Sequence, residues 1–175
     1  MTWRLDRFTG DGYDKGRPAV VQVLWLVTQS MLVRPWWVPA AVRRWVLRRF
    51  GARIGDGVLI RHRVRIHWPW KLEIGDHSWI GEGVWILNLE PVSIGSHTCV
   101  SQDVLICTGS HDRRSPSFEF DNGPIRIGDH CWLGARSTVL RGVTIGSQVV
   151  VGATALVVAD VADGTTILAP VAGVA

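Results

Sequence analysis

An aliphatic residue recurs every six positions through most of this 175-residue chain, and few folds can produce such a period. An amphipathic helix repeats every 3.6 residues and would not keep a strict six-residue step over fifteen positions. The step is interrupted at three places, where the chain is longer. The aliphatic positions are Ile54, Ile60, Ile66, Ile74, Ile80, Ile86, Ile94, Val100, Ile106, Ile127, Leu133, Val139, Ile145, Val151 and Val157.

A second column of mostly small or β-branched residues follows four positions after each aliphatic, as at Val58, Ser78 and Val104. Short strands that point one aliphatic residue inward, with a small residue at each corner, would fill a narrow interior. Three six-residue sides close a triangular coil, and successive coils pair strand on strand about 4.8 Å apart. The repeat therefore predicts an all-β solenoid, a parallel β-helix of hexapeptide repeats, over residues 54–165.

The interruptions of the repeat all fall on the same side of the predicted coil. In each of the first two coils the third side is slightly lengthened, at 66–73 and 86–93. In the next coil the third side extends over 106–126. Insertions on one face of a solenoid commonly build its binding surface. We therefore expect the long loop at 107–126 to carry functional residues.

Residues 1–53 lie outside the repeat and are expected to form an N-terminal helical segment, with helices at 18–33 and 39–50. They carry ten Lys or Arg residues against three Asp, a balance that could face an anionic partner. Two interpretations stay open. The helices could cap the open end of the solenoid or pack on a neighbouring subunit, or they could lie in a membrane interface, with tryptophans beside arginines. The expected apolar face of the second helix comprises Val42, Trp45, Val46 and Phe50.

The sequence also bears on the compartment. The longest apolar run, 19–27, is too short to span a bilayer, which needs about 20 residues, and the chain lacks signal-peptide features. Its three cysteines form no CxxC pair, which favours a reducing compartment. We expect a cytoplasmic protein, and the sequence leaves peripheral membrane contact open. The residues after the repeat, 166–175, are expected to form a C-terminal tail.

His111 differs from the other histidines because it lies in the long loop, between Ser110 and Asp112. An imidazole can accept a proton from a hydroxyl near neutral pH. In contrast, His77, His97 and His130 share the third position after an aliphatic residue, where a turn is expected. His111 is therefore the candidate for proton transfer.

Several segments resemble the galactoside and maltose type of hexapeptide-repeat O-acetyltransferase: WIGEGVWILNLEPVSIG, CTGSHD, IGDHCWLGARSTVLRGVTIG and VVGATALVVADV. The stretch FGARIGDGVLIRHRVRIHWPWKLEIGDHSWIGE is more similar to the acetyltransferases of colanic-acid and other exopolysaccharide pathways. The resemblance covers roughly residues 35–165. It implies a left-handed coil and a homotrimer.

The resemblance also implies a reaction. Acetyl-CoA would donate its acetyl group directly to a sugar or glycan-precursor hydroxyl, with no metal and no covalent enzyme intermediate. His111 matches the family's general base, and Asn88 matches its asparagine near the substrate hydroxyl. The repeat register supports this pairing, since Asn88 and Thr108 each lie two residues past an aliphatic and should stack on adjacent rungs. Asp112 could bind substrate or orient His111, or could simply be a turn residue.

For acetyl-CoA, the resemblance implies a groove between adjacent coils of two subunits. Small residues would let the pantetheine arm approach the backbone, although the repeat itself also favours glycine at these positions. Val158 and Ala159 stand where the family has Thr-Lys, which puts contacts to the nucleotide phosphates in doubt. The matching cofactor-binding positions are Trp132, Gly134, Ala135, Gly152 and Ala153.

Two other functions remain alternatives. A γ-type carbonic anhydrase shares the expected fold but needs three zinc-binding histidines, and positions 113–116, just after His111, are Arg, Arg, Ser and Pro. A non-catalytic β-helix scaffold would be consistent with the change at Val158 and Ala159. Nucleic-acid binding is disfavoured because the basic residues lack interleaved base-stacking aromatics in a recognised module.

Overall fold

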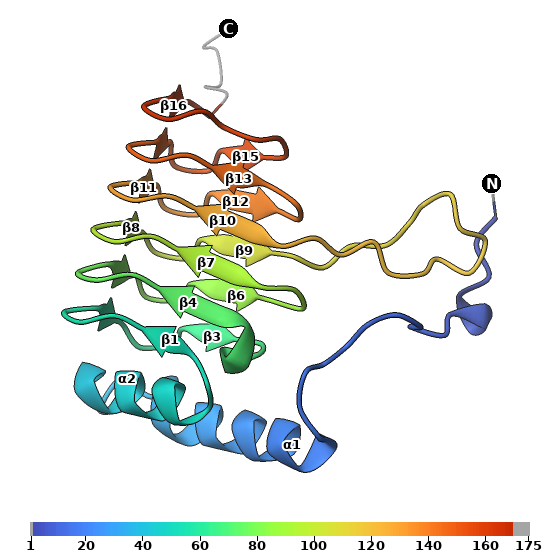
Figure 1. The fold of residues 1–175 in the computed structure, drawn as a ribbon, viewed down its shortest axis with the longest axis horizontal. Coiled ribbons are helices and arrows are strands. Elements are labelled where there is room, and N and C mark those ends of the chain that lie inside the picture. The colour runs from blue at the N-terminus through green and yellow to red at the C-terminus, as the bar shows by residue number, and fades with distance from the viewer. Residues whose placement is uncertain (1, 170–175) are drawn as a thin grey trace, which may run out of the picture.

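The computed structural model describes residues 2–169 as a β-solenoid built on a layer of N-terminal helices (Figure 1). All strand pairs within the three sheets are parallel, so the predicted parallel β-helix is confirmed. Every aliphatic residue of the six-residue series is buried. The period therefore marks the residues that point into the core.

The three sheets form the sides of the prism. Sheet A contains β1 (Arg53–Ile54), β4 (Leu72–Ile74), β7 (Val92–Ile94), β10 (Ile125–Ile127) and β13 (Thr144–Ile145). Sheet B contains β2 (Leu59–Ile60), β5 (Trp79–Ile80), β8 (Cys99–Val100), β11 (Trp132–Leu133), β14 (Val150–Val151) and β16 (Thr166–Ile167). Sheet C contains β3 (Arg65–Ile66), β6 (Trp85–Leu87), β9 (Leu105–Cys107), β12 (Thr138–Leu140) and β15 (Leu156–Val157).

The expected insertions all connect a strand of sheet C to the next strand of sheet A, as the sequence predicts. The first contains a short 3₁₀ helix, η3 (Pro69–Lys71), and the longest is the loop between β9 and β10. β16 (Thr166–Ile167) extends the solenoid into the segment expected as a tail, and residues 170–175 of that tail lie outside the described residues.

The helical layer contains α1 (Ala19–Thr28), which continues into the π-helical turn η2 (Gln29–Val33), and α2 (Ala40–Arg49). A 3₁₀ turn, η1 (Leu5–Arg7), precedes them. α2 lies against β1 and β2, while η2 contacts β3 and Trp25 of α1 bonds to the residues at its end, so the helical layer covers the first rung of the solenoid (Figure 1). Among residues 2–169, no helix is long and apolar enough to cross a membrane.

Besides burying apolar residues such as Val46 and Leu47, the cap supplies hydrogen-bond partners to the edge rung. An edge rung has unpaired carbonyls that would be costly to bury without donors. Trp25 donates its indole N–H to the carbonyls of Ile66 and His67, and Arg43 donates to the Ile60 carbonyl. Gln29 accepts the backbone N–H of Ile66.

This arrangement corrects one member of the expected apolar face of α2, Trp45, while Val46 is buried and Val42 and Phe50 pack against the core. Arg43 is buried, with 4% of its surface exposed, whereas Trp45 is 61% exposed. Burial lowers the pKa of Arg43 from its ordinary value, but the guanidinium keeps three backbone carbonyl acceptors. The need for donors at the edge rung outweighs the hydrophobic pattern of the helix.

Candidate active site

The long loop leaves the solenoid after β9 and returns at β10, and it extends well away from the prism (Figure 1). Its two limbs pair through a short antiparallel bridge between His111 and Phe120. At its base, the Asn122 side chain accepts the backbone N–H of Ser110, and Asp121 forms an ion pair with Arg141. The loop is thus a braced hairpin that holds His111 at a defined place.

The N-terminal segment, residues 3–13, lies along this loop and completes its packing (Figure 1). Trp3 packs against Phe118 at a tilted angle and donates its indole N–H to the Arg113 carbonyl at 3.0 Å. The Glu119 carboxylate accepts the backbone N–H groups of Thr9 and Gly10 at 3.1 and 3.0 Å. We call residues 3–13 the N-terminal arm.

The His111 ring is half-buried among aromatic side chains. It stacks on Phe118 with a centroid distance of 4.4 Å and on Phe120 at 5.3 Å, and Phe8 of the arm meets it edge-on at 5.6 Å. Its Nδ1 lies 2.7 Å from the Phe118 carbonyl oxygen. Because a carbonyl only accepts, Nδ1 carries the proton of the neutral ring, which leaves Nε2 as a lone-pair acceptor. This is the tautomer that a general base requires.

Asp112 does not orient His111 in this structure. Its carboxylate accepts the backbone N–H of Arg114 at 2.8 Å and closes a local turn, which is a common role for Asp. The Phe118 carbonyl holds the imidazole instead. A contact between Asp112 and substrate stays a prediction.

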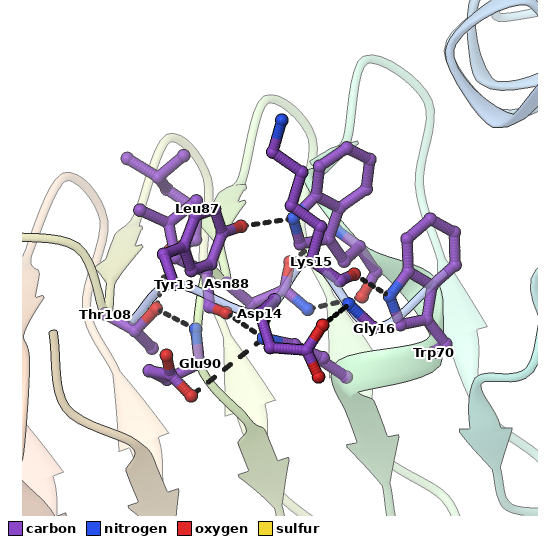
Figure 2. A network of polar contacts seen from close by, with 12 residues as sticks. Tyr13, Asp14, Lys15, Gly16, Trp70, Leu87, Asn88, Glu90 and Thr108 are labelled. Carbon is purple, nitrogen blue, oxygen red and sulfur yellow. Dashed lines mark hydrogen bonds and ion pairs between the residues drawn. The ribbon is translucent and has the colours of Figure 1, made fainter. Parts of the chain in front are cut away.

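Asn88 lies on the rung next to Thr108, as the register predicts, since Ile86 pairs with Ile106 and Leu87 with Cys107. Its side chain is fully buried. The amide oxygen accepts the backbone N–H groups of His67 and Trp68 at 3.1 and 3.0 Å, and the amide nitrogen donates to the Trp68 carbonyl at 2.6 Å (Figure 2). Asn88 therefore braces the first lengthened side, and a contact between its side chain and substrate stays a prediction.

Residues around Asn88 tie the base of the N-terminal arm to the solenoid (Figure 2). Tyr13 accepts a hydrogen bond from the Trp68 indole, and Lys71 donates to the carbonyls of Asp14 and Leu89. Burial, followed by the charges of Lys15 and Lys71, lowers the pKa of the neighbouring His67 below 6.5. His67 is thus kept neutral in this basic, partly buried surrounding.

The positions expected to bind the acyl donor gather on two adjacent rungs of sheet B. Trp132 is 55% exposed on β11, and its indole N–H donates to the Ser101 hydroxyl. Ala135 and Ala153 occupy the turns after β11 and β14, where the Thr154 N–H bonds to the Ala135 carbonyl. We call these small residues and the neighbouring exposed indole the Trp132 shelf.

Gly134 and Gly152 follow the same strands, but stacking explains one of them without a ligand. A Cβ on Gly134 would lie 2.5 Å from the backbone nitrogen of Ala153, so the coil itself requires glycine there. A Cβ on Gly152 would meet its nearest atom, the Ile167 carbonyl oxygen, at 3.1 Å. Both positions keep the rungs close enough to form the shelf.

The loop and the Trp132 shelf lie apart within one chain. Sheet B and the loop occupy opposite sides of the solenoid (Figure 1), because the loop connects sheet C to sheet A. Within residues 2–169, no three His, Cys, Asp or Glu side chains gather where they could hold a metal ion.

The arm contacts and the aromatic surround of His111 are functional features that the repeat did not reveal. Phe8, Tyr13 and Glu119 act across more than 100 residues of sequence or from within an irregular loop. One signal was present, since FEF at 118–120 is the most aromatic stretch of the loop. Nothing in the sequence indicated that residues 3–13 pack on it.

Glu119→Gln is expected to loosen the N-terminal arm while the solenoid keeps its stability. The amide removes the charge that strengthens the bonds from Thr9 and Gly10. Hydrogen exchange should show faster exchange at Thr9 and Gly10, with Glu73→Gln as the control carboxylate at a distant surface ion pair. These bonds lower the pKa of Glu119 below 4.5, so the wild-type arm should stay protected above pH 4.5 and open as the pH falls below it. Unchanged protection in Glu119→Gln would contradict this anchoring role.

Comparison with known proteins agrees with this architecture. Residues 124–157 match a family model described as the hexapeptide repeat of succinyl-transferase. A protein of Escherichia coli K12 named as a colanic acid biosynthesis acetyltransferase, WcaF, is 43% identical over 145 residues, which cover 81% of this chain and 78% of that protein. Nodulation protein L of Rhizobium meliloti is 33% identical over 56% of this chain and 55% of its own length.

The solved structures agree on the fold. The hexapeptide-repeat acetyltransferase VCA0836 of Vibrio cholerae, solved with acetyl coenzyme A, superposes with a TM-score of 0.81 at 24% identity, covering 94% of this chain and 91% of its own. The solenoid, the lengthened third sides and the WcaF similarity along four-fifths of the sequence point the same way. The chain belongs to the hexapeptide-repeat acetyltransferase family.

Proposed function

We propose that this protein is an O-acetyltransferase that moves an acetyl group from acetyl-CoA to a hydroxyl of a sugar or glycan precursor, with His111 as general base. The observation that carries the proposal is the 2.7 Å contact between His111 Nδ1 and the Phe118 carbonyl. It leaves Nε2 free to accept a proton on a ring that three phenylalanines hold in place.

The proposed step balances without a metal or a covalent intermediate. Nε2 of His111 takes the proton of the acceptor hydroxyl while the hydroxyl oxygen attacks the thioester carbonyl carbon. The C–S bond then breaks, the thiolate leaves, and the imidazolium returns the proton to the sulfur. A positioned base contributes about 10²–10⁴-fold, and bringing the two substrates together contributes further acceleration.

The donor side of the proposal is the Trp132 shelf. The indole offers a flat apolar surface, and Ala135, Gly152 and Ala153 leave room for a thin chain near the backbone. The Vibrio cholerae structure contains acetyl coenzyme A, and a galactoside acetyltransferase structure with a TM-score of 0.77 contains coenzyme A. Val158 is 62% exposed and offers no charge to a phosphate, so neighbouring arginines would have to do so.

The acceptor side lies around the loop. In this proposal Asn88 shapes the acceptor wall through the backbone at 67–68, and Asp112 does so through the turn at 112–114. A sugar acceptor is supported by relatives named for colanic acid biosynthesis and as galactoside O-acetyltransferase.

The direct test is release of free CoA thiol from acetyl-CoA in the presence of a panel of glycosides, with mass analysis of the acetylated product. Calorimetric titration with acetyl-CoA separates this function from a scaffold, for which no binding is expected.

The separation of loop and shelf within one chain supports a homotrimer in which each site is shared by two copies. His111 of one copy would then meet the Trp132 shelf of the next. Cyclic symmetry makes every such interface equivalent, so three sites would form per trimer.

Hybrid assemblies provide a sharp test of the shared site. His111→Ala removes the base, and Ala153→Trp fills the exposed shelf without entering the core. Each variant alone should be nearly inactive. After mixed refolding, about one quarter of the interfaces should pair an intact loop with an intact shelf and regain activity. Absence of any regain, despite hybrid formation seen by native mass spectrometry, would contradict a site shared between copies.

A further inference from the structure

The helix α1 and its continuation η2 are apolar on both sides. Trp25, Gln29 and Val33 face the solenoid and are buried. The opposite side carries an exposed stripe at the i, i+3, i+4, i+7 spacing of a second hydrophobic face. Its members are Val20 (74% exposed), Val23 (60%), Leu24 (56%), Val27 (49%) and Met31 (64%).

More apolar surface adjoins this stripe. A half-open groove of about 740 Å³ runs between α1 and α2, and exposed Leu24, Leu32 and Trp45 line it. Trp36 and Trp37, in the turn that joins η2 to α2, are also exposed. Monomeric proteins rarely expose contiguous apolar patches of this kind, which mark interaction surfaces. We call the stripe, the groove and this turn the basal face, since they lie at the helical end of the solenoid (Figure 1).

The charged side chains of the segment that builds the basal face are all positive. Residues 15–55 contain eight Lys or Arg residues and no Asp or Glu. Arg17, Arg48 and Arg49 line the groove, and Arg34 follows η2 directly. Within the described residues, Arg17, Arg34 and Arg49 are exposed and form no ion pair. These cations remain available to an anionic partner.

This charge also decides between occupants. A second copy placed against the same face would bring arginines against arginines, because residues 15–55 supply no carboxylate to pair with them. An anionic bilayer supplies a hydrophobic layer that accepts the stripe and the tryptophans. It also supplies phosphates that pair with the arginines. The helices are too short to cross it, so they would lie in its interface.

We propose that the basal face docks this protein on the surface of an anionic phospholipid bilayer. α1 lies parallel to the surface with its outer stripe in the interface, Trp36, Trp37 and Trp45 sit at headgroup depth, and the arginines contact lipid phosphates. The solenoid then stands away from the membrane.

Flotation with vesicles tests this proposal independently of catalysis. Wild-type protein should float with phosphatidylcholine vesicles that contain about one-third phosphatidylglycerol, and at least about tenfold less with pure phosphatidylcholine. Salt should weaken the binding, because exposed charges are screened. Arg17→Gln with Arg49→Gln should lower the partition coefficient about 25-fold, at about fivefold for each arginine. Val23→Gln with Val27→Gln should lower it at least about tenfold, since both side chains are exposed and leave the cap intact.

The matched control is Trp79→Ser, which removes an exposed tryptophan from β5, outside the basal face, and should bind like wild type. Circular dichroism and acetyl-CoA titration confirm that each variant is folded. Equal binding to neutral and anionic vesicles, or unchanged binding by the basal variants, overturns the proposal. It is also overturned if wild-type protein stays with the aqueous fraction. A multimer that dissociates on Val23→Gln with Val27→Gln in analytical ultracentrifugation would assign the face to subunit contact instead.

Discussion

His111→Ala is expected to lower kcat for acetyl transfer by about 10²–10⁴-fold while leaving the affinity for acetyl-CoA unchanged. The imidazole Nε2 is the acceptor for the hydroxyl proton in the proposed step, and the Phe118 carbonyl fixes the tautomer that makes it available. The Trp132 shelf lies on sheet B, whereas His111 lies in the loop that joins sheet C to sheet A. Donor binding should therefore not depend on the His111 side chain. Steady-state kinetics with saturating glycoside, together with calorimetric titration of acetyl-CoA, separates the two effects.

The control for this prediction is His97→Ala. His97 is exposed at a corner of the solenoid, where it stacks on His130 at a centroid distance of 5.0 Å and meets His77 at a tilted angle at 5.1 Å. It should therefore retain wild-type turnover. Near wild-type kcat in His111→Ala would rule out the general-base role, whatever the identity of the acceptor.

Asn88→Ala is expected to lower the free energy of unfolding by about 1–3 kcal/mol. The substitution leaves the buried backbone N–H of Trp68 without its partner, whereas the His67 N–H keeps the Ile86 carbonyl and the Trp68 carbonyl keeps the Lys71 N–H. Each buried polar group left without a partner costs about 1–3 kcal/mol. Chemical denaturation followed by tryptophan fluorescence measures the change.

Kinetics of the same variant separate its two possible roles. If Asn88 is a structural brace, kcat/KM per folded molecule should fall only to the extent that the displaced acceptor wall weakens acceptor binding. If Asn88 contacts the substrate directly, kcat/KM for the acceptor alone should fall further. Gln102→Ala is the control, since it removes an exposed amide side chain at a turn and should change neither quantity. Wild-type stability in Asn88→Ala would contradict the bracing role.

The sequence predicted the side chains of the solenoid well and those of the helices less well. Along the coil, burial follows directly from strand alternation, so Ile80, Val100 and Leu133 were correctly placed in the core. On α2, the hydrophobic pattern predicted Trp45 inside, whereas the structure buries Arg43. The edge rung's demand for hydrogen-bond donors is a property of the assembled fold, and no local pattern on the helix reports it.

The candidate site divides in the same way. His111 and the pairing of Asn88 with Thr108 on adjacent rungs followed from counting residues along the repeat. The carbonyl that orients His111, the phenylalanines around it and the arm that supplies Phe8 depend on how irregular segments pack. Such contacts join residues far apart in sequence and carry no periodic signal.

The six-residue step and its one-sided interruptions were therefore sufficient, from the sequence alone, to determine a parallel β-solenoid with a long loop on one side. They could do so because each strand's inward residue repeats at a fixed interval, which is a local property of the chain. Only the tertiary structure decided that the Asn88 side chain hydrogen-bonds the backbone of residues 67–68 and that Phe118 rather than Asp112 orients His111. It also decided that the loop and the Trp132 shelf lie apart. Those outcomes depend on hydrogen-bond partners and packing surfaces that exist only once distant segments have met.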